Sequence, residues 1–226
     1  MIIYTLIRSN RKTAAIYVKN GKVEVRAPLE MKKSEIEDFL YAKMDWVRTI
    51  LEKQQAQANQ RESFAIDYGS RLLFRGRQYP ITQRDGTRGL AGFNKDEFYM
   101  PPGLSPEQIK STCVRLYKML AKTHISSRVA FFSTQMGVTA SSVKINSAKK
   151  RWGSCSSQKS LNFSWRLIMA EDRVIDYVTV HELAHLKEMN HSSRFWALVE
   201  AILPDYRERK VKLKELHHRL CGEDWE

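Results

Sequence analysis

Two histidines four residues apart, His181 and His185, are the residues whose type and spacing point most directly to chemistry. On an α-helix this spacing brings two imidazoles to one face, one turn apart, where both can bind a single metal ion. Glu182 follows the first histidine and can reach a metal-bound water as a general base. The pattern predicts a metal site that activates water.

His191 is the candidate third ligand, six residues beyond His185. On a continuous helix, six steps of about 100° would turn it roughly 120° away from the other two. A break near Asn190 would bring it back, because Asn tolerates the left-handed conformation that ends helices. Three histidines and a water make an open, catalytic zinc geometry.

The elements that must position these residues can be outlined from local patterns. Residues 173–180 are rich in apolar side chains and lack Gly and Pro, so the helix of the histidine pair should begin near Asp172. A second helix should follow a cap at Ser192 or Ser193. Strands are expected at residues 143–145 and 161–165, and a capping box at residues 105–108 predicts a helix to about residue 132.

The N-terminal part of the chain looks mixed. Asn20-Gly21 predicts a hairpin, and a helix is expected from about Ser34 to about Gln57. The polar tract 54–60 is interpreted as a helix end and linker, and residues 64–103 as short strands joined by turns. The expected class is α+β, with a β-rich N-terminal region that includes a helix over residues 1–103 and a metallohydrolase domain over residues 104–226.

Positive charge is concentrated in one stretch. The 226 residues carry a net charge of +13, and residues 108–170 contain 11 Lys and Arg but no Asp or Glu. Such a stretch raises the local concentration of anions, so nucleic acid, a nucleotide or an acidic protein is a candidate partner. An ordinary solvated basic surface is the alternative.

Composition narrows the class of protein and its compartment. No apolar run approaches the roughly 18 residues of a membrane helix, and the first residues do not resemble a signal peptide. Three widely spaced cysteines do not suggest a disulfide framework. We therefore expect a cytoplasmic globular protein without a membrane partner, and the residues leave its oligomeric state open.

A series of motifs resembles the YgjP-like metallopeptidase-domain family, whose members are described as predicted metal-dependent hydrolases and are similar to SprT-type zincins. The resemblance is strong over residues 143–212 and weaker toward the N-terminus. The motifs that carry it are Arg151-Trp152-Gly153-Ser154-Cys155-Ser156-Ser157, Trp165-Arg166-Leu167, Val174-Ile175-Asp176-Tyr177-Val178, His181-Glu182-Leu183-Ala184-His185-Leu186 and Asn190-His191-Ser192-Ser193-Arg194-Phe195-Trp196.

The resemblance implies a zincin-like core in which a small sheet lies beside the active-site helix. It matches His181, His185 and His191 to the metal ligands and Glu182 to the catalytic acid/base. It also ties Arg151 closely to the site. Arg151 and Tyr206 are candidate substrate-binding residues, chosen for their charge, chemistry and expected proximity.

We therefore expect a zinc-dependent hydrolase, a metallopeptidase in the first instance, with Ni²⁺ and Co²⁺ as alternative ions. Its substrate would be a peptide. One alternative is a pyrophosphatase or phosphohydrolase acting on nucleoside triphosphates, because metal-activated water also attacks phosphoryl groups. Another is a nucleic-acid-associated binding protein with a structural metal, although such a protein would not need Glu182.

Overall fold

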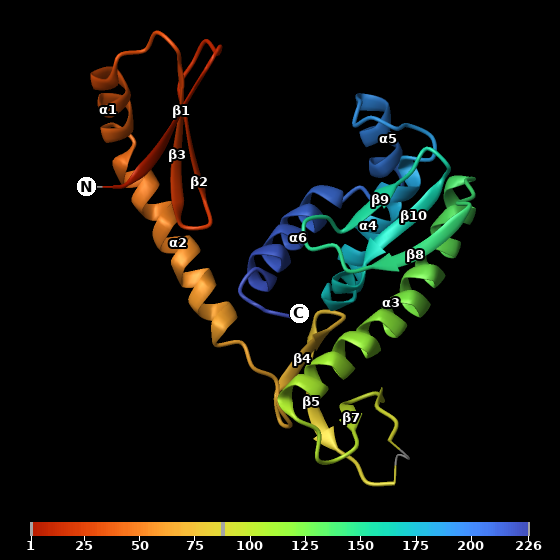
Figure 1. Ribbon diagram of the computed structural model, residues 1–226. Helices are drawn as coiled ribbons and strands as arrows, with labels where there is room; N and C mark the ends of the chain where they lie inside the picture. The colour runs from red at the N-terminus through yellow and green to blue at the C-terminus, as the bar shows by residue number, and fades with distance from the viewer. Residues whose placement is uncertain (1, 87–88, 226) are drawn as a thin grey trace. The chain divides into compact units, whose positions relative to one another are not determined.

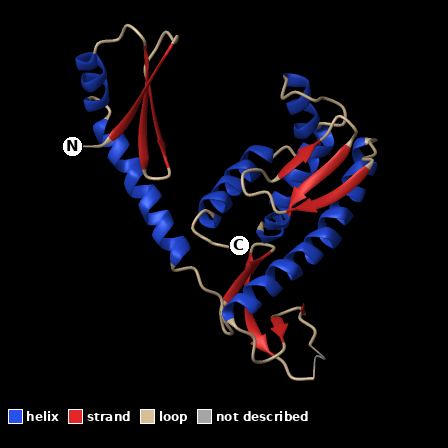
Figure 2. Ribbon diagram, viewed as in Figure 1, coloured by secondary structure: helices blue, strands red, loops and turns tan. Residues whose placement is uncertain are grey.

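A computed structural model describes residues 2–86 and 89–225, and its helices and small sheets confirm the expected α+β class. The chain forms two compact units. One extends to Phe64 and includes Cys221–Asp224, and the other comprises Ala65–Leu220 and Trp225. Figures 1 and 2 show their elements. Residues 65–103 thus belong to the same compact unit as the three histidines. That the hydrolase domain itself begins at residue 104 stays a prediction.

The first unit is a three-stranded sheet with two helices. Its elements are β1 (Tyr4–Ser9), β2 (Ala15–Lys19), β3 (Lys22–Pro28), α1 (Lys33–Tyr41) and α2 (Met44–Glu62). The central strand β3 runs parallel to β1 and antiparallel to β2. The β2–β3 hairpin confirms the prediction from Asn20-Gly21, whose φ angles of 52° and 71° are the left-handed values that a tight hairpin turn needs.

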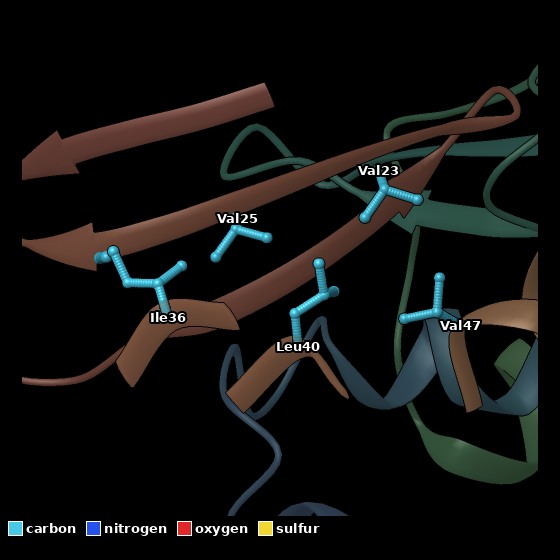
Figure 3. Packing of buried hydrophobic residues seen from close by; sticks show 6 residues of the cluster. Val23, Val25, Ile36, Leu40 and Val47 are labelled. Carbon is cyan, nitrogen blue, oxygen red and sulfur yellow. The ribbon is translucent and has the colours of Figure 1, made fainter. Parts of the chain in front are cut away.

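The core of this unit lies between β3 and the helices (Figure 3). Val23 and Val25 alternate with more exposed residues along β3, so both side chains reach the same face of the sheet. Ile36 and Leu40 of α1 and Val47 of α2 cover that face. All five side chains are at most 4% exposed, and their burial is the main apolar contribution to holding the helices on the sheet.

The single helix expected over residues 34–57 was wrong in two respects. The helix ends at Tyr41 and a new one begins at Met44, and no Gly or Pro explains the break. The polar tract continues α2 to Glu62. Its side chains act through hydrogen bonds: Gln54 accepts from the Gly21 N–H at 2.8 Å and donates to the Val18 carbonyl at 3.0 Å.

The second unit contains two small sheets and the remaining helices. Its elements are β4 (Arg71–Phe74), β5 (Arg77–Gln83), β6 (Gly92–Phe93), β7 (Phe98–Met100), α3 (Pro106–Met136), β8 (Ser142–Asn146), β9 (Gly153–Cys155), β10 (Ser160–Ser164), the 3₁₀ helix η1 (Trp165–Met169), α4 (Asp172–Ala184), α5 (Ser193–Ile202) and α6 (Tyr206–Leu220). The strand orders are β4-β5-β7-β6 and β8-β10-β9. The short strands expected between residues 64 and 103 are confirmed.

The long helix α3 links the parts of this unit. Ser105 and Gln108 form the predicted capping box, and Gly137 ends the helix with a left-handed φ of 60°. Tyr117 stacks on Trp165 at 5.6 Å between ring centroids, and its hydroxyl donates to the Leu73 carbonyl at 2.8 Å. Helix α3 packs against α4, η1 and β8. No helix in the described part of the chain is long and apolar enough to cross a bilayer.

The sheet β8-β10-β9 lies beside the helix that carries the histidine pair (Figure 1). Strand β10 pairs in parallel with β8 and antiparallel with β9. The expected strands correspond to β8 and β10. Strand β9 was not foreseen, because residues 151–157 are rich in small residues. Strand β9 is at one edge of this sheet and contacts α4.

Candidate metal centre

The last turn of α4 presents His181 and His185 on one face. The helix ends at Ala184, but His185 keeps a helical backbone, with φ −63° and ψ −18°. The two ring centroids are therefore 5.0 Å apart, as expected for residues one turn apart.

The chain turns earlier than the sequence suggested. A break was expected near Asn190, but α4 ends six residues before it, at Ala184. The amides of Leu186 and Lys187 make short-range bonds to the carbonyls of Leu183 and Ala184, both at 3.0 Å, which tighten the last turn. The segment that follows returns His191 to the histidine pair.

The three imidazoles converge. The Nε2 atoms of His181 and His191 are 3.1 Å apart, and the donor atoms of His181, His185 and His191 all lie within 4.8 Å of one another. Two nitrogens on one tetrahedral zinc would be roughly 3.3 Å apart, given bonds of about 2.0–2.1 Å. Across residues 2–86 and 89–225, no other group of three or more His, Cys, Asp or Glu residues converges in this way.

Hydrogen bonding orients one ring of the cluster. His185 Nδ1 is 3.1 Å from the Glu188 carbonyl, which can only accept, so Nδ1 carries the proton and Nε2 keeps its lone pair. Burial lowers the pKa of His185 and, with the neighbouring histidines and Lys210, lowers that of His181 to about 3. Neutral imidazoles are the form that binds metals.

Glu182 is buried beside the cluster. The residue is 5% exposed, and its Oε2 is buried without a hydrogen-bond partner among the described residues. Burial raises its pKa to about 8, because a low-dielectric environment disfavours the charged carboxylate. A nearby divalent cation would favour the charged form.

Gly153 of β9 makes room for Glu182. A Cβ at this position would lie 2.5 Å from Oε1 and 2.6 Å from Cγ of Glu182, closer than side-chain atoms approach one another. The carboxyl group therefore lies directly against the backbone of the edge strand. Gly153 was noted only as a member of the motif at residues 151–157, although the close approach of a backbone to another group is a common reason for a glycine.

Aromatic rings surround the histidines. Phe195 lies 4.9, 4.5 and 4.7 Å from the ring centroids of His181, His185 and His191. Trp196 is 5.7 Å from His191, and both aromatic residues are on α5, which begins at the predicted Ser192 cap. These rings limit the access of water to one side of the cluster.

The cluster fits a divalent ion in chemistry and arrangement. Three imidazole nitrogens converge, and Glu182, the neighbour of His181 in sequence, has a buried carboxyl oxygen without a hydrogen-bond partner among the described residues. A family model for the YgjP-like metallopeptidase domain matches residues 12–216, which is most of the chain. The chain belongs to this family. Metal-dependent hydrolysis is thus its chemistry.

Two solved structures are similar to part of this YgjP-like protein. The crystal structure of the metallopeptidase zymogen abylysin of Pyrococcus abyssi matches with a TM-score of 0.38 and 24% identity, over 40% of this chain and 92% of the other. That of jannalysin of Methanocaldococcus jannaschii matches with a TM-score of 0.37 and 20% identity, over 40% and 94%. No curated protein matches the chain.

The two candidate substrate-binding residues of the YgjP-like protein have different environments. Arg151 is exposed in the segment that precedes β9. Tyr206 is 6% exposed and stacks on Trp196 at 5.3 Å, so one ring separates it from His191. Their roles stay predictions.

The acid-free stretch 108–170 is not a uniform free surface. Arg128 pairs with Asp176, Lys122 donates to the Val143 carbonyl, and Arg166 donates to the Ser147 carbonyl at 3.0 Å. These three bases contribute to the fold of the YgjP-like protein. An anionic partner for the remaining bases stays a prediction.

Proposed function

We propose that the protein is a zinc-dependent peptidase in which His181, His185 and His191 hold the ion and Glu182 is the general base. The observation that carries the proposal is the convergence of three donor atoms within 4.8 Å, together with a buried carboxyl oxygen of Glu182 that has no hydrogen-bond partner in the described part of the chain. A purely structural site would not require that carboxyl group. Three nitrogen ligands suit Zn²⁺, and they also accept Ni²⁺ or Co²⁺.

When bound, the ion would supply Lewis acidity to the scissile carbonyl and lower the pKa of water. The protein supplies the proton transfer. Glu182 accepts a proton from the attacking water and passes it to the leaving amine. The contact with Gly153 and the burial of the residue hold its carboxyl group in one place during both transfers.

The rest of the cluster orients the ligands and excludes water. The Glu188 carbonyl fixes the ring of His185, and the Phe195 ring packs against all three histidines. An apolar ring that keeps water away from one side of the site strengthens the electrostatic interactions inside it. The comparisons with known proteins do not support hydrolysis of nucleoside triphosphates. This reaction is kept as the alternative result that the experiment below can detect.

The test compares Glu182→Gln with the matched control Glu188→Gln, which changes the same functional group near the site but leaves the Glu188 carbonyl intact. Metal content is measured by elemental analysis, and turnover is measured on an unstructured protein and on nucleoside triphosphates. We expect both variants to keep the metal, and Glu182→Gln alone to lose at least about 10²-fold in peptide turnover.

Wild-type turnover by Glu182→Gln would remove Glu182 from the reaction. Phosphate or pyrophosphate release that depends on Glu182, without peptide cleavage, would establish the nucleotide alternative instead.

A further inference from the structure

A groove of about 450 Å³ borders the histidine cluster. Its lining comes from α5 and α6 and consists of Trp196, Tyr206, Arg207, Lys210, Val211 and Lys214. We call it the α6 groove. Tyr206 was already a candidate substrate-binding residue and Trp196 ends the motif that contains His191, whereas the other four residues of the groove, all on α6, were not foreseen.

Trp196 connects the α6 groove to the candidate metal centre. Its ring centroid is 5.7 Å from that of His191 and 5.3 Å from that of Tyr206. Lys210 Nζ lies 5.3 Å from the same indole centroid, within the range of a cation–π contact. A ligand in the groove would therefore be one aromatic ring away from the histidines.

The cations of the groove share one face of α6. Arg207, Lys210, Val211 and Lys214 are spaced three, four and seven residues from the first, which places them on one stripe of the helix. Arg207 is neutralised by Glu200 at 2.9 Å. No carboxylate in the described part of the chain lies within ion-pair distance of Lys210 or Lys214.

Two neighbouring bases of α6 have acidic partners. Arg209 pairs with Asp205 and Lys212 with Glu215, both at 2.9 Å. Within the α6 groove, positive charge without an acidic partner among the described residues therefore belongs to Lys210 and Lys214, which lie beside the aromatic rings of Trp196 and Tyr206. This combination suits a ligand that has a short apolar stem and a negative end.

We propose that the α6 groove is a substrate subsite for a carboxylate group of the peptide. The proposal rests on the proposed peptidase function, because a peptide held at the histidines would place a neighbouring residue in the groove. The methylene groups of a Glu or Asp side chain would pack on Trp196 and Tyr206 while the carboxylate pairs with Lys210 and Lys214. A carboxylate at the end of the chain offers the same chemistry.

The experiment measures binding separately from cleavage. The zinc-loaded Glu182→Gln protein is titrated with terminally blocked, alanine-based decapeptides that carry either four consecutive Glu or four consecutive Gln. A third peptide has only Ala and a free carboxyl end, which distinguishes the end of the chain from a side chain. We expect the Glu peptide or the free-ended peptide to bind roughly five- to tenfold more tightly than the Gln peptide.

Substitutions on α6 locate the effect. Lys210→Ala with Lys214→Ala should remove the preference. Lys210→Ala and Lys214→Ala should each weaken it, whereas Lys212→Ala, which removes one charge elsewhere on the same helix, should keep it. The preference should also shrink as salt is raised. All three lysines are on the surface of α6, and circular dichroism of each variant checks that the helix is retained.

The outcomes separate this proposal from the peptidase assignment. Equal binding of all the peptides, or a preference that survives loss of both lysines, would overturn the subsite. The subsite would also be overturned if a nucleoside triphosphate displaced the bound peptides while the protein showed no preference for the acidic ones. Lysine-dependent binding in a protein whose wild-type form cleaves no peptide would keep the subsite and refute the peptidase function.

Discussion

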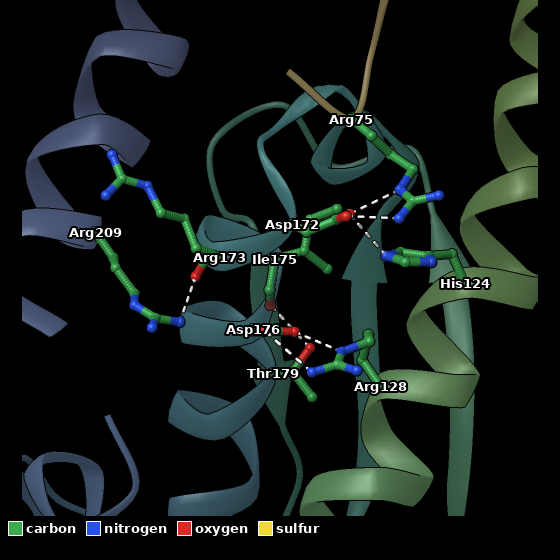
Figure 4. Close-up of polar contacts among 9 residues, drawn as sticks. All are labelled: Arg75, His124, Arg128, Asp172, Arg173, Ile175, Asp176, Thr179 and Arg209. Carbon is green, nitrogen blue, oxygen red and sulfur yellow. Dashed lines mark hydrogen bonds and ion pairs between the residues drawn. The ribbon is translucent and has the colours of Figure 1, made fainter. Parts of the chain in front are cut away.

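The polar side chains at the two ends of helix α4 differ in whether they have partners. Near its start, Asp172 and Asp176 face basic residues of neighbouring elements (Figure 4). Arg75 meets Asp172 through two hydrogen bonds of 2.7 and 2.5 Å, and Arg128 of α3 meets Asp176 through two of 2.6 and 3.1 Å. Bidentate pairs of this kind fix the position of a helix as well as its charge balance.

Near its end, the same helix leaves polar atoms without partners. His181 Nδ1 and Glu182 Oε2 are both buried and make no hydrogen bond with the described residues. Each such atom costs about 1–3 kcal/mol relative to a satisfied one. Ion pairs thus hold the helix at one end. At the other end, His181 and Glu182 keep polar atoms that a bound ligand could stabilise. The four predictions below test this contrast, in order of decreasing effect.

Metal affinity should depend on the residue outside the helix. Replacing His191 with Ala leaves two imidazoles and an underfilled site, so we expect affinity for zinc to fall by about 10³-fold while the fold is retained. Metal content after dialysis against a weak chelator measures this loss, with His217→Ala as the control. Full occupancy in the His191 variant would exclude this residue as a ligand.

Gly153→Ala should lower turnover by about 10²-fold, because the new methyl group would displace the Glu182 carboxyl group from its place. Metal content should stay normal. Ser154→Ala, the next residue of the strand, points to the opposite face and should behave like wild type.

A double substitution separates a specific contact from general damage. The stability cost of Gly153→Ala should vanish in a Glu182→Ala background, because the colliding side chain is then absent. An equal cost in both backgrounds, measured by urea unfolding, would mean that Gly153 acts on the strand and not on Glu182.

Arg128→Ala should destabilise the fold by about 2 kcal/mol without changing metal content. Its pair with Asp176 is largely buried, with 28% and 16% of the two side chains exposed, so the carboxylate would be left without its partner. Arg75→Ala should cost less, since its pair with Asp172 is 42% and 49% exposed. Urea unfolding of both variants tests the order, and a larger loss for Arg75→Ala would contradict it.

The smallest effect should depend on pH. The hydrogen bond from Arg75 lowers the pKa of Asp172 in the folded state. The stabilisation is therefore complete above the unfolded pKa of about 3.9 and is lost as pH falls through the lower folded value.

Asp172→Asn should accordingly cost about 0.5–1 kcal/mol at pH 7 and progressively less below about pH 4. Unfolding free energies of both proteins at several pH values measure the difference. Arg75→Gln should show the same pH window, and a difference that stayed constant down to pH 2 would show that the ion pair is not its cause.

Local signals in the sequence predicted the elements whose causes are local. The Asn20-Gly21 turn, the Ser105 and Gln108 capping box and the Ser192 cap each depend on a few adjacent residues, and each is found where it was expected. The polar tract 54–60 was wrongly interpreted as the end of the helix; within it, Gln54 contacts residues distant in sequence, Val18 and Gly21, which no local pattern shows.

For the candidate site, short-range spacing was enough to predict the histidine pair, since imidazoles at the spacing of His181 and His185 share a face on any helix. Only the tertiary structure decided that α4 stops at Ala184, that Gly153 of another element makes room for Glu182, and that Trp196 joins the cluster to the lysines of α6. These features depend on contacts between residues distant in sequence. Such contacts are set by how whole elements pack, which no short-range pattern encodes.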